Sequence, residues 1–418
     1  MALKAVAVSD LHLGEPASIL CDQTPPRAKK GSLEKENAID ELATAVHDIA
    51  VDEGREARVE ELILLGDIPD MILDGSKDFK VSKQNTKNLI SAILKKGVKL
   101  DRVVFVPGNH DYGLWVTMVE KQNNRNTKDK KKSYGDCKKT NYDFKKDGAS
   151  WVVDFENIKD VNNDFKNEFL PKADFDVLVA NPIYSISGDK NFYLFHHGHL
   201  TAPLVMRSAV LKKIDEGKIK NTEDLENEVS DWVRLIWGIK RKTSWVRRVW
   251  EFGWKRGFTR LDLVKELLLG QGSGAIGAAF ARDERGVDDG ELQHNIKSFI
   301  ELACKVPLNG SKPDMFDKDY KFHYVFGHSH YGGRAEDKEN ILLVKNDAGR
   351  KKSINVWNLG GWVVPRHLFP PYAYIFYVKS DWTADRCLLF SSKFEGLKTR
   401  YYPSKYLKIH ALAEREIG

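Results

Sequence analysis

The chain is poor in cysteine and has none of the cysteine pairs that hold metals or form redox sites. Its four cysteines in 418 residues, Cys21, Cys137, Cys304 and Cys387, lie far apart and form no Cys-x-x-Cys pair. This distribution argues against a disulfide scaffold and against a thiolate zinc site, and it fits a reducing compartment. A metal site in this chain would therefore use His, Asp and Asn side chains.

Long hydrophobic runs are also absent. No stretch approaches the roughly 20 apolar residues that cross a bilayer. Residues 1–8 carry one lysine but no apolar leader and no small-residue cleavage site, so we expect no signal peptide.

With 42% hydrophobic and 30% charged residues and a net charge of +6, the composition indicates a mildly basic globular protein. We expect it in the cytoplasm, either free or attached to a membrane surface.

Apolar runs and helical periodicities alternate in the first quarter of the chain. Residues 3–8, 61–65 and 103–106 have the composition of buried strands, and 33–51 and 89–97 carry apolar residues at helical spacing. Alternation of strand and helix predicts βαβ units and a largely parallel sheet.

Short strands follow in the rest of the chain, and their spacing predicts antiparallel hairpins. They are expected at 177–180, 184–187, 192–195, 321–326, 341–344, 354–357, 374–378 and 387–390. Residues 201–314 predict a helical insertion, which would divide the core into 1–200 and 315–418. The lysine-rich stretch at 120–148 has almost no apolar periodicity, so we expect a solvated loop there.

Five of the predicted strands are followed at once by residues of metal-ligand type. Because ligands of open α/β sheets bind beyond the carboxyl ends of the strands, these clusters should converge on one edge. Seven of the twelve histidines lie in them, which random scatter would not produce. Alternate residues leaving a strand point the same way, so an Asp-x-His pair can reach one ion. The clusters are 9–12, 66–70, 108–111, 196–199 and 327–330.

In sequence order these clusters resemble the signature of the calcineurin-like metallophosphoesterases. That signature is Asp-x-His, Gly-Asp-x-x-Asp, Gly-Asn-His-Asp, a His before Gly, and Gly-His-x-His, and the resemblance spans roughly residues 5–365. It implies an α/β fold, a four-layer αββα sandwich of two mixed sheets, here with a helical insertion. It also implies a dinuclear metal-dependent phosphoester hydrolase, in which a hydroxide that bridges the metals attacks phosphorus in line.

The resemblance further implies a role for each motif residue. One metal would be bound by Asp10, His12, Asp67 and His330, and the other by Asp67, Asn109, His197 and His328, so that Asp67 bridges both. We expect manganese first, with iron, zinc and cobalt as alternatives, because oxygen and imidazole ligands accept all of them. His110 would protonate the leaving oxygen or stabilise its charge, and Asp111 would orient the His110 imidazole.

Three neighbouring residues have plainer interpretations. We expect Asp70 in the loop or behind the ligands rather than on a metal. His196 should point to the opposite face from His197 and pack in the core, because residues alternate along a strand. His199 could contact substrate or a metal, or neither, and the sequence leaves this open.

Residues 232–256 combine five of the ten tryptophans with eight basic residues and one acidic residue. A basic helix with Trp on its apolar side is typical of segments that bind an anionic membrane surface, and it could also cover a lipid-phosphate substrate. Core packing of a helical subdomain and nucleic-acid binding remain alternatives.

Four short motifs indicate a narrower substrate class within this family. Residues 9–14, 66–75, 108–112 and 358–362 resemble the UDP-diacylglucosamine pyrophosphohydrolase branch of the family, which implies a lipid-linked phosphate or pyrophosphate. A nuclease or a cyclic nucleotide phosphodiesterase is the alternative enzyme. A non-enzymatic binding protein on the same fold is the other alternative, and the completeness of the ligand set argues against it.

The basic Trp-rich segment at 232–256 predicts binding to anionic membranes. We expect the protein to sediment with vesicles that contain anionic lipid at low salt and to be released at high salt, because salt screens the attraction. Protein that stays in the supernatant at low salt would contradict the membrane hypothesis.

Overall fold

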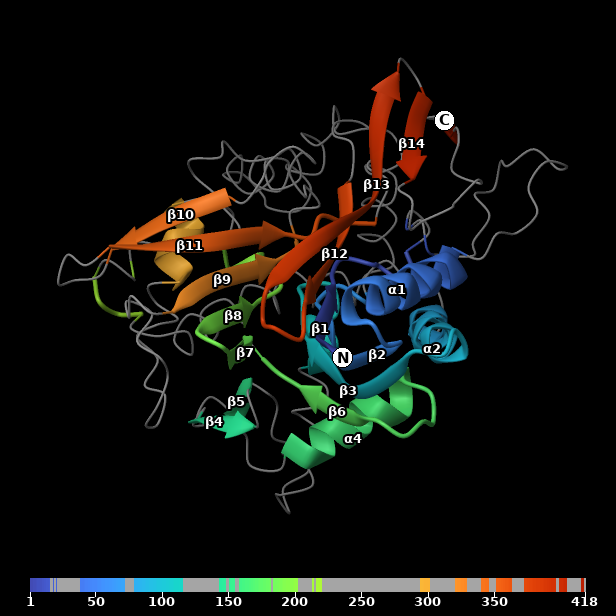
Figure 1. The fold of residues 1–418 in the computed structure, drawn as a ribbon, viewed down its shortest axis with the longest axis horizontal. Coiled ribbons are helices and arrows are strands. Elements are labelled where there is room, and N and C mark those ends of the chain that lie inside the picture. Colours follow the sequence, from blue (N-terminus) through green and yellow to red (C-terminus); the bar gives the residue numbers. More distant parts are fainter. Residues whose placement is uncertain are drawn as a thin grey trace, which may run out of the picture.

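The structure of the chain is a computed structural model (Figure 1). It describes residues 1–15, 18, 20, 38–71, 79–115, 143–147, 150–154, 158–181, 183–201, 213, 216–219, 294–300, 320–328, 340–345, 351–362, 372–395, 398–403 and 415–416. These residues form two packed β-sheets and the helices that cover them.

The first sheet has eight strands in the order β15-β14-β13-β12-β1-β2-β3-β6. Its parallel half consists of β1 (Leu3–Val8), β2 (Arg58–Leu65), β3 (Lys99–Val106) and β6 (Asp176–Val179). Its antiparallel half consists of β12 (Tyr372–Val378), β13 (Ala384–Glu395), β14 (Lys398–Pro403) and β15 (Arg415–Glu416).

The second sheet has seven strands in the order β10-β11-β9-β8-β7-β5-β4. Its strands are β4 (Asp143–Asp147), β5 (Ser150–Asp154), β7 (Tyr184–Gly188), β8 (Asn191–Phe195), β9 (Lys321–Phe326), β10 (Asn340–Lys345) and β11 (Lys351–Asn358). β9 pairs in parallel with β8 and β11, and the other neighbours are antiparallel. Both sheets are therefore mixed.

Helices lie on the outer faces of the sheets. Those covering the first sheet are α1 (Ala38–Gly54), α2 (Lys80–Lys95) and α4 (Ile158–Phe169) (Figure 1). Residues 294–300 form a helix against the second sheet, where the ring of Phe299 lies 5.8 Å from that of Tyr324 on β9. The prediction of an α/β fold with two mixed sheets and helices is confirmed.

The core between the sheets sets their spacing. β1 contributes the small side chains Ala5 and Ala7 to it, and β8 contributes Tyr193 and Phe195. The ring of Phe195 lies 6.0 Å from that of Phe376 on β12, so aromatic side chains join the two sheets. Burial of one such ring stabilises the fold by about 1.5–3 kcal/mol. This packing brings the strand ends of both sheets close together.

Three local predictions are wrong. Residues 177–180 and 321–326 do not belong to antiparallel hairpins. β6 lies beside β3 in parallel, with Phe105 opposite Val179, and β9 lies in parallel with both β8 and β11. A short apolar run does not reveal the direction of its neighbour, and α4 lies in the connection between β3 and β6. Residues 143–147, in the predicted loop, form β4 and pair with β5. β4 is mostly charged and so lacks the apolar alternation that would have indicated a strand.

The division of the chain into a core at 1–200 and 315–418 and an insertion at 201–314 stays a prediction. Most of the insertion, including the Trp-rich segment at 232–256, lies outside the described residues. β8 and β9, on either side of it, pair directly with each other. Within the part of the chain that the structure describes, no helix is long and apolar enough to cross a membrane.

His323 is a buried neutral histidine on β9. Its ring stacks on that of Tyr193 at 4.4 Å, and its Nδ1 accepts a hydrogen bond from Nε1 of Trp357 at 3.2 Å. A nitrogen that accepts a hydrogen bond carries no proton. Burial, with the charge of Lys321, lowers the pKa of His323 to about 4.

The lowered pKa of His323 predicts a loss of stability in acid. The unfolded chain takes up this proton near the ordinary value of 6.5, so the stabilisation is complete above that pH and is lost as the pH falls toward 4. Between about pH 7 and about pH 4.5, the unfolding free energy of the wild type should fall more steeply than that of His323→Gln. Urea unfolding at both pH values measures this, and equal slopes would count against the assignment.

Candidate metal centre

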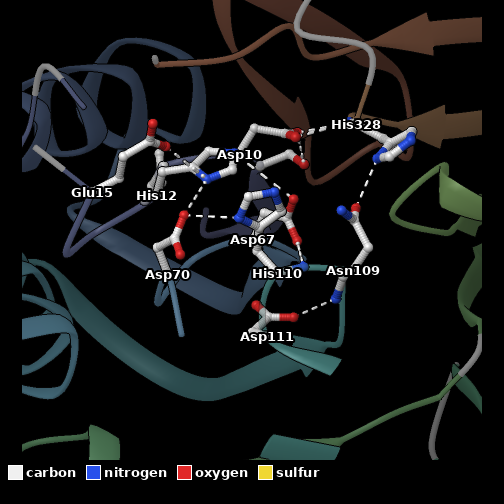
Figure 2. A network of polar contacts seen from close by, with 12 residues as sticks. Asp10, His12, Glu15, Asp67, Asp70, Asn109, His110, Asp111 and His328 are labelled. Carbon is white, nitrogen blue, oxygen red and sulfur yellow. Dashed lines mark hydrogen bonds and ion pairs between the residues drawn. The ribbon is translucent and has the colours of Figure 1, made fainter. Parts of the chain in front are cut away.

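The polar clusters that follow five strands meet at one edge of the two sheets. β1 is followed by Asp10 and His12, β2 by Asp67 and Asp70, β3 by Asn109, His110 and Asp111, β8 by His197, and β9 by His328. Figure 2 shows most of these side chains gathered in one network. The structure thus brings together every site residue predicted from the sequence except His330, which lies outside the described residues.

The backbone of the site adopts a conformation that side chains disfavour. Nine non-glycine residues in the described part have positive φ, and four of them are site residues: Asp10 (54°), His12 (47°), Asp67 (52°) and His328 (67°). Such conformations cost of order 1–3 kcal/mol each and persist only where the surroundings impose them. They cluster at functional sites, so their concentration here supports a functional role for this edge.

Glycines let the motif loops approach the site side chains. Gly66 has φ 75°, and a Cβ there would collide with the ring of His197. A Cβ on Gly327 would collide with the carboxylate of Asp10 and the hydroxyl of Ser9. These positions require glycine because the loops and side chains are in direct contact.

Asp67 lies at the centre of the network. Its Oδ1 accepts a hydrogen bond from the backbone N of His110 at 2.7 Å, and its Oδ2 lies 3.3 Å from Nε2 of His197 and 3.8 Å from Nε2 of His12. Burial would raise the pKa of Asp67, but the positive charges of His197 and His110 hold this pKa well below its usual value. Asp67 is therefore a buried carboxylate between imidazoles from both sheets.

The amide oxygen of Asn109 lies between two imidazoles. It is 2.9 Å from Nε2 of His197 and 2.8 Å from Nδ1 of His328. His197 donates Nδ1–H to the carbonyl of Leu65 at 3.1 Å, so Nε2 carries either a second proton or, when a metal ion replaces that proton, a lone pair. In the second case, this lone pair and the oxygens of Asn109 and Asp67 are all acceptors. A group of acceptors in contact fits a bound cation.

The surrounding charges favour a cation at this edge. Burial disfavours a charged His197, but Asp67 and Asp10 raise the pKa of His197 to about 9. Burial also disfavours a charged His12, but the hydrogen bond to Asp70 and the charge of Asp67 raise the pKa of His12 to about 10. Both imidazoles thus hold a positive charge strongly, as expected where negative groups are in excess.

His12 is held by two buried carboxylates. Its Nδ1 donates to Oδ2 of Asp70 at 2.9 Å and lies 3.4 Å from Oε2 of Glu15 (Figure 2). Metal-binding histidines commonly donate their second N–H to a carboxylate in this way. Glu15 was not among the site residues predicted from the sequence. It directly follows Gly14, which has φ 120°, and a carboxylate next to a glycine just after the first motif could have indicated it.

The carboxylate of Asp10 joins the ends of β1 and β9. Both of its oxygens accept from the backbone N of His328, at 3.0 and 2.9 Å, and Ser9 donates its hydroxyl to it. Burial outweighs the charge of His197 and raises the pKa of Asp10 to about 6. Asp10 therefore ties the first sheet to the second at the site.

The imidazole of His110 is oriented by Asp70, so the predicted contact with Asp111 is wrong. Nδ1 of His110 donates to Oδ2 of Asp70 at 2.8 Å (Figure 2). The carboxylate of Asp111 is instead occupied by two backbone donors, the N–H of Gly108 at 2.5 Å and that of Ile68 at 3.1 Å. Asp111 thereby fixes the loop after β3 against the loop after β2.

The two other histidines of the fourth motif lie beside each other, with ring centroids 5.0 Å apart. His196 packs in the core as predicted: its ring lies 4.5 Å from that of Phe299, and its Nδ1 lies 3.2 Å from the hydroxyl of Tyr324. His199 is buried at the start of a 3-10 turn, 5.6 Å from the ring of His197.

Nitrogen and oxygen atoms of the described residues come close enough to hold metal ions. Three groups have ligand atoms within 4.8 Å of one another: His12, Asp67 and His110; Asp67, His197 and His328; and His12, Glu15 and Asp70. Asp67 belongs to two of them. The donors are imidazole nitrogens and carboxylate oxygens without sulfur, a set that fits divalent manganese, iron, cobalt or zinc.

A family model described as calcineurin-like phosphoesterase matches residues 3–332. The chain belongs to the calcineurin-like phosphoesterase family. No curated protein shows significant similarity to it. Family membership, with the groups of metal-ligand atoms, makes this chain a metal-dependent phosphoesterase.

Close packing at Gly327 predicts that a single added methyl group disrupts the site. We expect Gly327→Ala to displace the carboxylate of Asp10 and to lower metal content and phosphoesterase activity, measured by metal analysis and hydrolysis of bis-p-nitrophenyl phosphate. Gly113→Ala is the matched control, because a Cβ there meets no atom within 4 Å. Equal metal content and activity in both variants would contradict this account.

Proposed function

We propose that this phosphoesterase holds two divalent metal ions with Asp67 between them. The ligands would be Asp10, His12, Asp67 and His330 for one ion and Asp67, Asn109, His197 and His328 for the other. The observation that carries the proposal is the membership of Asp67 in two groups of ligand atoms. One group contains histidines from the first sheet and the other contains histidines from the second. We expect manganese, with iron, zinc and cobalt as alternatives.

When bound, the two ions would supply positive charge for phosphate oxygens and acidify a water molecule for attack on phosphorus. Two carboxylates, Asp10 and Asp67, do not neutralise two divalent ions, so the site keeps a net positive charge that attracts phosphate. The chain itself keeps these carboxylates buried and in place through Ser9 and the backbone of His328 and His110.

We assign proton transfer to the leaving oxygen to His110. Asp70 accepts from its Nδ1, so Nε2 is the nitrogen that can serve the substrate, as general acid or hydrogen-bond donor. The side chain of His110 is 18% exposed, whereas Asp70 is fully buried. Asp111 would act only through the loop backbones that it joins.

The substrate class that we propose is a lipid-linked phosphate or pyrophosphate ester. It is supported by the likeness of residues 66–75 and 358–362 to the UDP-diacylglucosamine pyrophosphohydrolase branch, and by the basic Trp-rich segment at 232–256. The second of these motifs lies against the site, since the backbone N of Trp362 donates to the carbonyl of Asp10 at 3.1 Å.

A nuclease or cyclic nucleotide phosphodiesterase is the alternative. A substrate screen with a lipid-linked pyrophosphate, single-stranded nucleic acid and a cyclic nucleotide separates the two hypotheses. Hydrolysis of bis-p-nitrophenyl phosphate without turnover of any of these would leave both specific substrate classes unsupported.

The role of His110 predicts a selective loss of turnover. We expect His110→Asn to lower kcat on the order of 10²–10⁴-fold, the usual contribution of general acid catalysis, while metal content stays at the wild-type level. Hydrolysis of bis-p-nitrophenyl phosphate and metal analysis of the same sample measure the two quantities.

Two further variants sharpen the assignment. His47→Asn is the control, because the partner of His47 among the described residues is the adjacent Asp48 on α1, away from the site. Asp70→Asn should lower both turnover and metal affinity, because Asp70 accepts from both His110 and His12. If His110→Asn loses metal, His110 is a ligand in the group with His12 and Asp67. If it remains fully active, His110 is not the acid.

A further inference from the structure

His199 is a buried histidine whose ring nitrogens have no hydrogen-bond partner among the described residues. Its side chain is 2% exposed, and neither Nδ1 nor Nε2 makes a hydrogen bond among the described residues. The other buried histidines of the described part each have a partner on at least one ring nitrogen. These are His12, His196, His197 and His323.

An imidazole without partners is unfavourable in a protein interior. A neutral ring carries one N–H donor and one acceptor nitrogen, and burial of both without hydrogen bonds costs free energy of folding. Nearly all buried polar side chains of native proteins are paired, and the exceptions call for a ligand, a water molecule or a catalytic role. A molecule that enters the site is one source of the missing partner of His199.

Hydrogen bonds fix the backbone of the turn that carries His199. His199 begins the 3-10 turn His199–Thr201, in which Thr201 donates both its N–H and its hydroxyl to the carbonyl of Gly198 at 2.9 and 2.7 Å. Gly198 has φ 115°, and a Cβ there would lie 2.9 Å from the carbonyl oxygen of Gly327. The β8 and β9 loops thus pack against each other at this point.

The ring of His199 lies beside the metal-ligand groups but outside them. Its centroid is 5.6 Å from that of His197, 6.5 Å from that of His328 and 6.4 Å from that of Tyr112. Among the described residues, His199 belongs to none of the groups whose ligand atoms come within 4.8 Å of one another. Its absence from these groups favours a contact with a molecule bound at the metals over direct binding of a metal.

We propose that His199 is a substrate-binding residue whose imidazole N–H donates to an oxygen of the phosphate group held at the metal centre. The inference rests on the proposed function and assigns a further contact to the same site. His199 is about as buried as Asp67 and His197, and its ring lies 5.6 Å from that of His197, so a phosphate that reaches His197 also comes near His199. A phosphate oxygen supplies the acceptor that the described residues do not.

The test measures binding of inorganic phosphate to the manganese-loaded protein by isothermal titration calorimetry. We expect His199→Phe to keep the ring shape and the metal content and to bind phosphate at least about tenfold more weakly, because the N–H donor is lost. His323→Phe is the matched control: it replaces a buried imidazole that stacks on Tyr193 within the second sheet, and it should bind phosphate like the wild type.

Every outcome bears on the proposal. His199→Gln retains an N–H donor, so it should recover part of the phosphate affinity. If His199→Phe does not fold, the phosphate affinity of His199→Gln tests the proposal. Unchanged phosphate affinity in a folded His199→Phe protein overturns the inference while the proposed function stands. Loss of metal in this variant also overturns it, since His199 would then be a ligand. A wild type that takes up no metal and shows no turnover refutes the proposed function itself.

Discussion

A buried carboxylate that needs positive charge from both sheets organises this site. Asp67 is 1% exposed, and an isolated charge at such depth would be very unfavourable. His12 approaches it from the first sheet and His197 from the second, so both imidazoles reach the carboxylate only when the two sheets are packed together. This arrangement of side chains therefore depends on the packed sheets. The aromatic core between the sheets supplies the stabilisation that this arrangement requires.

The backbone is strained where the side chains of the site come together. Ligands on different loops can reach one point only if the loops turn sharply and nearly touch, which explains the positive φ of Asp10, Asp67 and His328. It also explains why a Cβ on Gly66 or Gly327 would collide with ligand side chains. Residues that violate local conformational preference are typical of sites maintained for function rather than stability.

The sequence predicted which side chains meet at this edge of the sheets because the signals for them are local. A buried strand followed by a ligand-type residue is visible within ten residues, and β1 and β9 have the bounds that their apolar runs indicate. Contacts between residues that lie far apart in the sequence could not be predicted. Asp111 is adjacent to His110 but is occupied by backbone donors, whereas Asp70 reaches His110 from the loop after another strand. The direction of β6 likewise depends on the crossover through α4 and not on its own residues.

One oxygen of Asp70 couples the two halves of the chemistry. Oδ2 accepts from Nδ1 of His12 at 2.9 Å and from Nδ1 of His110 at 2.8 Å, and the two rings are 4.6 Å apart and perpendicular. In the proposed mechanism, a carboxylate oxygen that polarises both imidazoles would make His12 a stronger ligand and His110 a better-oriented acid at the same time. Both imidazoles share this one acceptor. Metal binding at His12 and proton transfer at His110 would consequently be linked through Asp70.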